Sequence, residues 1–462
     1  MSRESQLLAT KSDTTQGNSL MNRRTFLAVG SQSAIFALAT RVTSANARRA
    51  PQPPALEDIE RRAAGVIEAF DAQGQHRTGT EVDRQSAEWL SAQVKRLGVL
   101  AVLEPFTLTR IDPRSSYVRI GDRRIDGVPL FDAGFTDPQG IRGALGPLGS
   151  GAEIALVESE PERLAYTEPV QRDQVEEARR AAHKAVVILT RGRKPGLFLL
   201  NASRFTAPAG PPMLQVSSAE ATSLHEQAAA RAEATLVAHV DRTIAQAFNV
   251  TAKIVGTNPG LAPLVVMAPR SGWWRCASEQ GSRLACWLEV IRAVRSGKPV
   301  RDCFFVALSG HELGFLGMTP YITRHPDLLR RSSVWIFFGS DLGASRQPNL
   351  IHASDEVLER WGVTTMENAG ITVDAKARYD SIARGETRTA QQAGGRFFTV
   401  ACDSQVHHSP ADRWPESIDV SNLARYARAF ATGVLQLAQQ TALADESRYR
   451  ELVARMGLPL RL

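Results

Sequence analysis

The stretch Val265–Val290, VVMAPRSGWWRCASEQGSRLACWLEV, contains the pattern that decides the fold. A continuous apolar run comes first, a polar loop follows it, and apolar residues then recur at helical spacing. A continuous apolar run of this length is typical of a strand that is buried on both faces of a sheet. The pattern therefore predicts a buried strand, a loop and a helix. The loop contains neither histidine nor aspartate, and its polar side chains include Ser271, Cys276, Ser278 and Glu279.

The same alternation of strand and helix extends over the second half of the chain. Further apolar runs are NVTAKIV, DCFFVAL, SVWIFF and RFFTVAC. Helical stretches separate several of them. This order predicts an α/β fold in which helices sandwich a mostly parallel central sheet. In such sheets, ligands bind beyond the carboxyl ends of the strands, so the loops at those ends are where chemistry is expected.

Residues 123–245 differ from their surroundings. They are rich in glycine and proline and contain short apolar runs such as AVVILT (Ala185–Thr190) and ATLVAHV (Ala234–Val240). We expect them to form a smaller inserted α/β lobe. The main domain would then consist of two parts, residues 48–122 and 246–462.

The first 47 residues have the features of an export signal. Arg23 and Arg24 precede a short apolar run over 26–39, and the small residues of SANA end at Ala47. A charged region, an apolar region and a small-residue site together predict a secretory signal. The paired arginines before Thr-Phe-Leu resemble a twin-arginine signal. We expect recognition by the twin-arginine export machinery, cleavage near Ala47 and a periplasmic or secreted protein, with Met1 or Met21 as the start.

Composition narrows the class of protein. Of the 462 residues, 43% are hydrophobic and 22% are charged, which suits a globular chain with a sizeable core. The formal charge is +7, but no long basic run is interleaved with aromatic residues, so nucleic-acid binding is not expected. The apolar run near the N-terminus is too short for a stable membrane anchor. The four cysteines have no paired spacing and predict buried free thiols.

Four loops at predicted strand ends each offer a side chain that can bind a metal. These side chains are Glu279, Glu312, Asp341 and His408. Carboxylates combined with an imidazole can hold zinc and leave one position open. In SGHELGFLG, His311 stands next to Glu312, but Phe315 occupies the place of the second histidine of an HExxH motif. The helix-borne zinc motif is therefore absent.

Four segments resemble a known family over nearly the whole mature chain. They are HRTGTEVDRQSAEWLSAQVKRLG, NVTAKIVGT, FFVALSGHELGFLGMTPYI and HHSPADRWPESIDVSNLARYARAF. They are similar to motifs of the di-zinc exopeptidases of the aminopeptidase Y, glutamate carboxypeptidase and transferrin-receptor type (peptidase clan MH). The resemblance implies the exopeptidase fold and release of residues from peptide ends. It also implies that the insert at 123–245 is a protease-associated domain.

This chain departs from the family where the first metal ligands should stand. The family has His and Asp in an H-x-D motif, and this chain has Pro269 and Ser271 at those positions. Proline offers no side-chain ligand. One of the two metal positions has therefore lost its imidazole, and the resemblance implies at most one zinc.

The other family positions carry over with changes. In ASEQGSR, which resembles the family pattern A-x-D-[ND]-x-[ST]-G, Glu279 matches the bridging aspartate. His311 stands at the general-base glutamate, and Glu312 matches the ligand that follows it. Asp341 matches the next ligand and His408 the last, although the adjacent His407 is an alternative. The resemblance thus implies a degenerate site built from Glu279, Glu312 and His408.

These residues allow three hypotheses. The first is an exopeptidase-like hydrolase that acts on a peptide or small amide, with one zinc and His311 accepting a proton from water. The second is a metal-free hydrolase in which Cys276 or Ser278 is the nucleophile, His311 its base and Asp341 the group that orients His311.

The third hypothesis is a catalytically inactive protein of the same fold that holds no metal. In that case Trp273 and Trp274, together with Arg275, would form a pocket for a peptide or an acidic ligand. The alternative for the two tryptophans is packing against the inserted lobe.

Overall fold

A computed structural model describes residues 55–159, 174–344 and 348–441. The predicted signal over 1–47 lies outside these residues. Among the helices in the described ranges, none has both the length and the apolar character needed to cross a bilayer.

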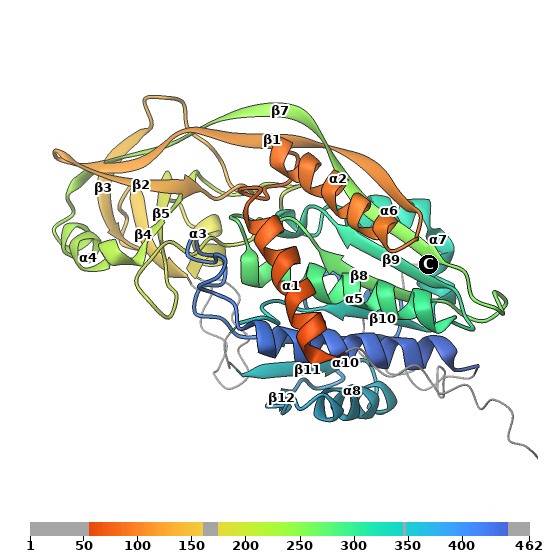
Figure 1. The fold of residues 1–462 in the computed structure, drawn as a ribbon. Helices are drawn as coiled ribbons and strands as arrows, with labels where there is room; N and C mark the ends of the chain where they lie inside the picture. Colours follow the sequence, from red (N-terminus) through yellow and green to blue (C-terminus); the bar gives the residue numbers. More distant parts are fainter. Residues whose placement is uncertain (1–54, 160–173, 345–347, 442–462) are drawn as a thin grey trace, which may run out of the picture. The chain divides into compact units, whose positions relative to one another are not determined.

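The central sheet is mixed, with a parallel middle. In spatial order, its strands are β1 (Ala101–Ile120), β7 (Glu233–Ile254), β9 (Cys303–Leu308), β8 (Leu264–Pro269), β10 (Val334–Phe338), β13 (Phe397–Cys402), β11 (Asn349–Ala353) and β12 (Ala375–Lys376). Neighbouring strands among β9, β8, β10 and β13 are parallel, whereas β7 and β11 pair antiparallel with this group. The apolar runs that the sequence marks as strands are all strands, and the predicted α/β class is confirmed (Figure 1).

Helices cover both faces of this sheet. One face packs against α1 (Leu56–Asp71), α2 (Glu81–Arg96), α5 (Ser282–Gly297), α8 (Glu356–Asn368) and α10 (Val420–Gln439). The other packs against α6 (Met318–Arg324), α7 (Pro326–Arg331) and α9 (Thr387–Gln392). Along β8, Leu264 and Val266 enter the first core and Val265 and Met267 enter the second. This alternation follows from the two-residue period of a strand, and it explains why the whole run is apolar.

Residues between β1 and β7 form a smaller group of strands and helices with its own apolar clusters. Its elements are β2 (Arg123–Pro129), β3 (Ile141–Pro147), β4 (Ile154–Ser159), α3 (Gln174–Arg180), β5 (Ala185–Thr190), β6 (Met213–Ser217) and α4 (Ala221–Ala229). Strands β1 and β7 pair along their length, from Ala101 with Ala252 to Ile120 with Ala234, and serve both parts (Figure 1). Because β7 continues through residue 245 and Val118 of β1 already lies in the core of the smaller group, the domain limits stay a prediction.

The loops after the parallel strands meet at one edge of the sheet, since the strands run in the same direction. The loop after β8 leads into a π-helical turn, η2 (Ala277–Gly281), which continues as α5. The loop after β9 contains a short 3-10 turn, η3 (His311–Leu313). These two turns and the loop after β13 carry the polar side chains described next.

Candidate metal centre

Glu279, His407 and His408 form a compact group of potential metal ligands. One ligand atom from each lies within 4.8 Å of the others. Glu279 comes from η2, and the two histidines come from the loop after β13. Glu279 is 1% exposed and His408 is 2% exposed. The structure thus brings together two of the ligands predicted from sequence and adds His407.

The hydrogen bonds of His408 establish which ring nitrogen carries its proton. Nδ1 lies 2.6 Å from the carbonyl oxygen of Leu199, and a carbonyl can only accept, so Nδ1 is the donor. Burial lowers the pKa of His408, and the nearby His407 lowers it further. Its Nε2 lies 3.4 Å from Glu279 Oε1. An Nδ1 donor bond of this kind is what orients a histidine that binds a metal through Nε2.

His407 is oriented by a carboxylate. Its Nδ1 lies 2.8 Å from Asp341 Oδ2, so Nδ1 donates and Nε2 is left for another partner. Burial acts to lower the pKa of His407, but the charge and hydrogen bond of Asp341 outweigh it and raise the pKa to about 9. Asp341 Oδ1 also accepts a hydrogen bond from Ser278 Oγ at 2.9 Å. Asp341, predicted as a ligand, is therefore placed behind His407 with both oxygens hydrogen-bonded to the protein.

Glu279 has one oxygen without a partner. Its Oε1 accepts a hydrogen bond from Gln280 Nε2 at 2.9 Å. Its Oε2 is buried, and no donor among the described residues reaches it. Burial acts to raise the pKa of Glu279, but the charges of His408 and His407 outweigh it and hold the pKa below its ordinary value. A buried, ionised oxygen without a donor is costly unless a cation binds it. Two imidazoles and one carboxylate are a donor set that suits catalytic zinc.

Glu312, the remaining predicted ligand, is not in this group. Its Oε1 accepts from the Thr78 backbone N–H at 2.8 Å and from Thr78 Oγ1 at 2.7 Å. Its Oε2 accepts from Ser271 Oγ at 2.7 Å. Ser271 stands where the family has aspartate, and its hydroxyl can donate where a carboxylate cannot. Both oxygens of Glu312 therefore have protein donors, which sequence matching alone does not reveal.

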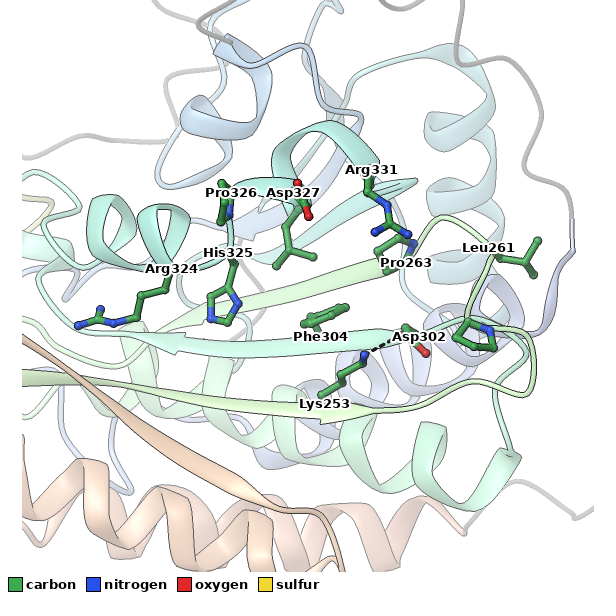
Figure 2. Close-up of a pocket in the computed structure, with 12 residues that line it drawn as sticks. Lys253, Leu261, Pro263, Asp302, Phe304, Arg324, His325, Pro326, Asp327 and Arg331 are labelled. Carbon is green, nitrogen blue, oxygen red and sulfur yellow. Dashed lines mark ion pairs between the residues drawn. The ribbon is translucent and has the colours of Figure 1, made fainter.

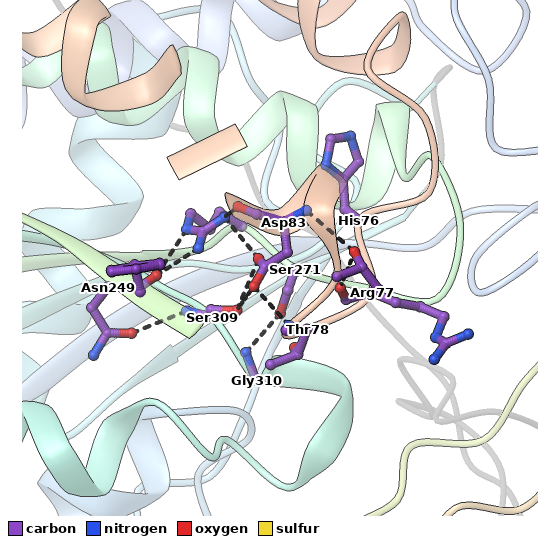
Figure 3. Close-up of polar contacts among 12 residues, drawn as sticks. His76, Arg77, Thr78, Asp83, Asn249, Ser271, Ser309 and Gly310 are labelled. Carbon is purple, nitrogen blue, oxygen red and sulfur yellow. Dashed lines mark hydrogen bonds and ion pairs between the residues drawn. The ribbon is translucent and has the colours of Figure 1, made fainter. Parts of the chain in front are cut away.

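Beside Glu312 lies a buried polar network (Figure 3). Arg270 Nη1 lies 2.8 Å from Asp83 Oδ1, and both side chains are fully buried. Ser309 Oγ donates to the same carboxylate at 3.0 Å. Asn249 Oδ1 accepts from the Ser309 backbone N–H at 3.1 Å. Asp83 is thereby supplied with donors by the protein and needs no metal ion to balance it.

His311 has a different partner from the one predicted. Its Nδ1 lies 3.0 Å from Glu386 Oε1, and Asp341, the predicted partner, is engaged with His407. Glu386 immediately precedes α9 and belongs to none of the motifs, so the sequence offered no signal for it. With Nδ1 donating to Glu386, Nε2 of His311 remains able to accept a proton. The charge of His311 also helps to hold the pKa of Glu279 below its ordinary value.

The predicted nucleophiles are poorly placed for metal-free catalysis. Cys276 is buried, and burial together with the charges of Glu279 and Asp412 raises the pKa of its thiol well above the ordinary value. The thiolate is the reactive form, so this environment disfavours attack by sulfur. Ser278 Oγ donates to Asp341 rather than to His311. The geometry therefore gives no support to a nucleophile–His311–Asp341 triad.

The predicted substrate-binding residues have structural partners. Trp273 is buried, packs edge-on against Phe131 at 5.1 Å, and donates from Nε1 to Asn201 Oδ1 at 3.2 Å. Trp274 Nε1 donates to the backbone carbonyl of His408 at 2.9 Å. Arg275 donates to the Asp71 carbonyl at 2.8 Å. The tryptophans thus pack against the inserted segment and brace the loop that carries the histidines.

Backbone strain is concentrated at this edge of the sheet. Three non-glycine residues here have left-handed backbone angles: Cys276 (φ 53°), Asp341 (φ 62°) and His408 (φ 59°). Such conformations are uncommon for side chains with a Cβ and persist where the surrounding structure enforces them. Each of these residues is a member or a neighbour of the ligand group.

A separate groove lies at the opposite ends of the strands. It has a volume of about 360 Å³, and Lys253, Asp302, Phe304 and Arg331 are among its lining residues (Figure 2). Asp302 and Phe304 are at the start of β9, whereas His311 and Glu312 follow the end of that strand. The groove is therefore not part of the candidate metal centre.

Comparison with solved structures shows the same fold in several peptidases. A zinc aminopeptidase from Bacillus subtilis (BSAP) superposes with a TM-score of 0.67 at 18% identity, covering 86% of this chain and 98% of that chain. A peptidase M28 precursor from Shewanella amazonensis gives 0.67 at 17% identity, covering 84% and 97%. An aminopeptidase from Aneurinibacillus sp. gives 0.63 at 16% identity, covering 85% and 97%.

At these identities, the likeness establishes the fold that the sequence motifs implied. No family model matches the chain, and no curated protein matches it in sequence. What the centre does must therefore be argued from its own residues.

Proposed function

We propose that this protein is a metallo-exopeptidase-like hydrolase with a single zinc site formed by Glu279, His407 and His408. The observation that carries the proposal is the buried Glu279 Oε2, which has no donor among the described residues and belongs to a group whose ligand atoms lie within 4.8 Å of one another. The zinc aminopeptidase from Bacillus subtilis, which has a similar fold, supports it. We propose peptides or small amides as substrates.

Separate residues would bind the metal, orient its ligands and accept a proton. Glu279, His407 and His408 would hold a zinc ion, which would supply a Lewis acid for the activation of water. Leu199 and Asp341 accept hydrogen bonds from Nδ1 of the two histidines, so Nε2 of each would be the ligand atom, and His407 would lose its Nε2 proton when the ion binds. His311 is held at Nδ1 by Glu386 and would accept a proton at Nε2. The imidazole therefore takes over the proton-accepting role that the family resemblance assigns to a glutamate.

The test is chelator-sensitive hydrolysis of a panel of aminoacyl and carboxy-terminal amide substrates. We expect His408→Ala to abolish the activity, and His311→Gln to lower kcat by about 10²- to 10⁴-fold while zinc stays bound. His225→Ala, which changes an exposed histidine of the inserted segment, is the control and should leave activity unchanged. Activity that survives both chelation and His408→Ala would refute the proposal.

A binding protein without catalysis is the second candidate. The observation that favours it is the contact of the inserted segment with two loops of the site. The backbone N–H of Leu199 donates to the carbonyl of His408 at 3.1 Å, and that of Ala202 donates to the carbonyl of Glu312 at 2.8 Å. If zinc binds but no substrate is cleaved, peptide binding measured by calorimetry would identify this function. Absence of both cleavage and binding would exclude it.

Export through the twin-arginine machinery is part of the proposal and rests on residues 1–47 alone. Expression of the full chain in a bacterium followed by N-terminal sequencing tests it. We expect a mature terminus near residue 48 in the periplasmic fraction or the medium. Replacement of Arg23 and Arg24 by lysine should retain the protein in the cytoplasm.

A further inference from the structure

Arg283 lies at the start of α5, where the family pattern A-x-D-[ND]-x-[ST]-G has glycine. It follows Glu279 by four residues, so the two side chains lie on the same face of the continuous turn from η2 into α5. Arg283 is only 3% exposed. A glycine has therefore been replaced by the largest cationic side chain, inside the site.

The guanidinium has few partners. Its Nη1 donates to Gln280 Oε1 at 3.1 Å, and its charge lies 5.6 Å from the centre of the Phe337 ring. Its Nε is buried without a partner. In the described parts of the chain, no carboxylate oxygen lies within the 4.0 Å of an ion pair with it. The guanidinium of Arg283 is thus buried with at least one N–H donor, Nε, unpaired.

Gln280 links this cation to the metal ligand. Its amide nitrogen donates to Glu279 Oε1, and its amide oxygen accepts from Arg283. The positive charge is held one amide group away from Glu279, and Oε2 of Glu279 stays free. Glu279, Glu386 and Asp341 are the carboxylates whose charges act most strongly on Arg283.

The charges of the site determine how many divalent ions it can take. The buried carboxylates of Glu279, Glu386 and Asp341 act on Arg283 by their charge. When both ligand histidines are neutral, one guanidinium and one divalent cation balance these three negative charges. A second divalent ion would leave excess positive charge in a buried site, where like charges repel strongly.

We propose that Arg283 is a permanent cation that takes the place of a second metal ion and limits this centre to one. The inference rests on the proposed zinc site. It predicts that Arg283 weakens zinc binding by repulsion while stabilising the metal-free protein by balancing the carboxylates.

The experiment measures zinc affinity by chelator competition and thermal unfolding of the metal-free protein. The variants are Arg283→Gln, which removes the charge, and Arg283→Lys, which keeps it. Arg292→Gln is the control, since Arg292 is a partly exposed cation on the same helix. We expect Arg283→Gln to bind zinc at least tenfold more tightly, or to bind a second equivalent, and to unfold at a lower temperature without metal. Arg283→Lys and the control should stay within about twofold of the wild type in zinc affinity.

Unchanged zinc affinity in Arg283→Gln would overturn the inference, and so would an equal gain in Arg283→Lys. If Arg283→Gln does not fold without metal, refolding with zinc supports the inference and failure of zinc to restore the fold opposes it. If the wild type binds no zinc, the proposed function falls. In that event Arg283→Gln tests the inference separately. Zinc binding by this variant would support the inference, and failure of this variant to bind zinc would refute it.

Discussion

At the scale of single residues, the centre depends on which nitrogen of each histidine carries a proton. His408 donates a hydrogen bond from Nδ1 to a backbone carbonyl, and His407 donates one from Nδ1 to Asp341. In both rings, Nε2 is thereby directed to other partners. Partners of this kind fix ring orientation and raise the basicity of a ligand.

Asp341→Asn tests the support of His407. The variant keeps the shape and tolerates the left-handed backbone angle, but it removes the charge that favours donation from Nδ1. We expect about a tenfold loss of zinc affinity, measured by chelator competition. Asp380→Asn, at an exposed ion pair with Arg378, is the control. Equal affinities for the two variants would show that Asp341 does not orient a ligand.

His76 gives a prediction about pH and stability. Burial lowers the pKa of His76 to about 3, even though Nε2 donates to the Phe70 carbonyl at 3.0 Å. The unfolded chain takes up this proton near pH 6.5, so it binds more protons than the folded state between about pH 6.5 and 3. Stability should therefore fall with acidification across that window, by at most about 1.4 kcal/mol per pH unit from this group.

Urea unfolding of the wild type and His76→Gln over that pH range measures this contribution. The variant should show a shallower dependence on pH, and His225→Gln should not. An identical slope for all three proteins would mean that His76 is protonated in the folded state.

At the scale of elements, the short turn η2 is the critical piece, since it carries Glu279. Asp412 holds it by accepting the backbone N–H groups of Ser278 and Glu279 at 2.7 and 2.9 Å. Burial and the nearby charge of Asp341 raise the pKa of Asp412 to about 7. This carboxylate does for η2 what a capping residue does for an ordinary helix.

Asp412→Ala should therefore be more damaging than loss of an ordinary cap. Two buried N–H groups lose their acceptor, and we expect a loss of about 2–4 kcal/mol in the free energy of unfolding. Asp419→Ala, which removes the N-cap of α10, should cost about 1 kcal/mol. Urea unfolding compares them, and equal losses would contradict the role given to Asp412.

The sequence predicts the elements well because local patterns determine them. The apolar runs are strands, as their composition predicts. The centre was only partly predictable. The motif points to His408 alone. The participation of His407 depends on the left-handed backbone of His408 and on Asp341, which lies in another loop. The replacement of the motif glycine by Arg283 was a readable signal, but Glu386 and the donors to Glu312 come from distant segments.

At the scale of the whole molecule, β1 and β7 connect the two apolar regions. Phe106 and Leu108 of β1 lie in one cluster, and Val118 of the same strand lies in the core of the inserted segment. The described residues also form a single compact unit. Unfolding one region would break strands that the other needs.

We therefore expect one cooperative thermal transition for residues 48–462. Calorimetry should give equal calorimetric and van't Hoff enthalpies. Two separate transitions would show that the inserted segment folds independently of the central sheet.

The central claim is a single zinc held by Glu279, His407 and His408, and the most direct test is the number of tightly bound zinc ions per chain. Residues 48–462 would be exposed to zinc, freed of loose ions by gel filtration and measured by elemental analysis. The account predicts one zinc in the wild type and in Glu312→Gln, and none in His407→Ala or His408→Ala. No zinc in the folded wild type, two zinc ions, or loss in Glu312→Gln with retention in His407→Ala would contradict it.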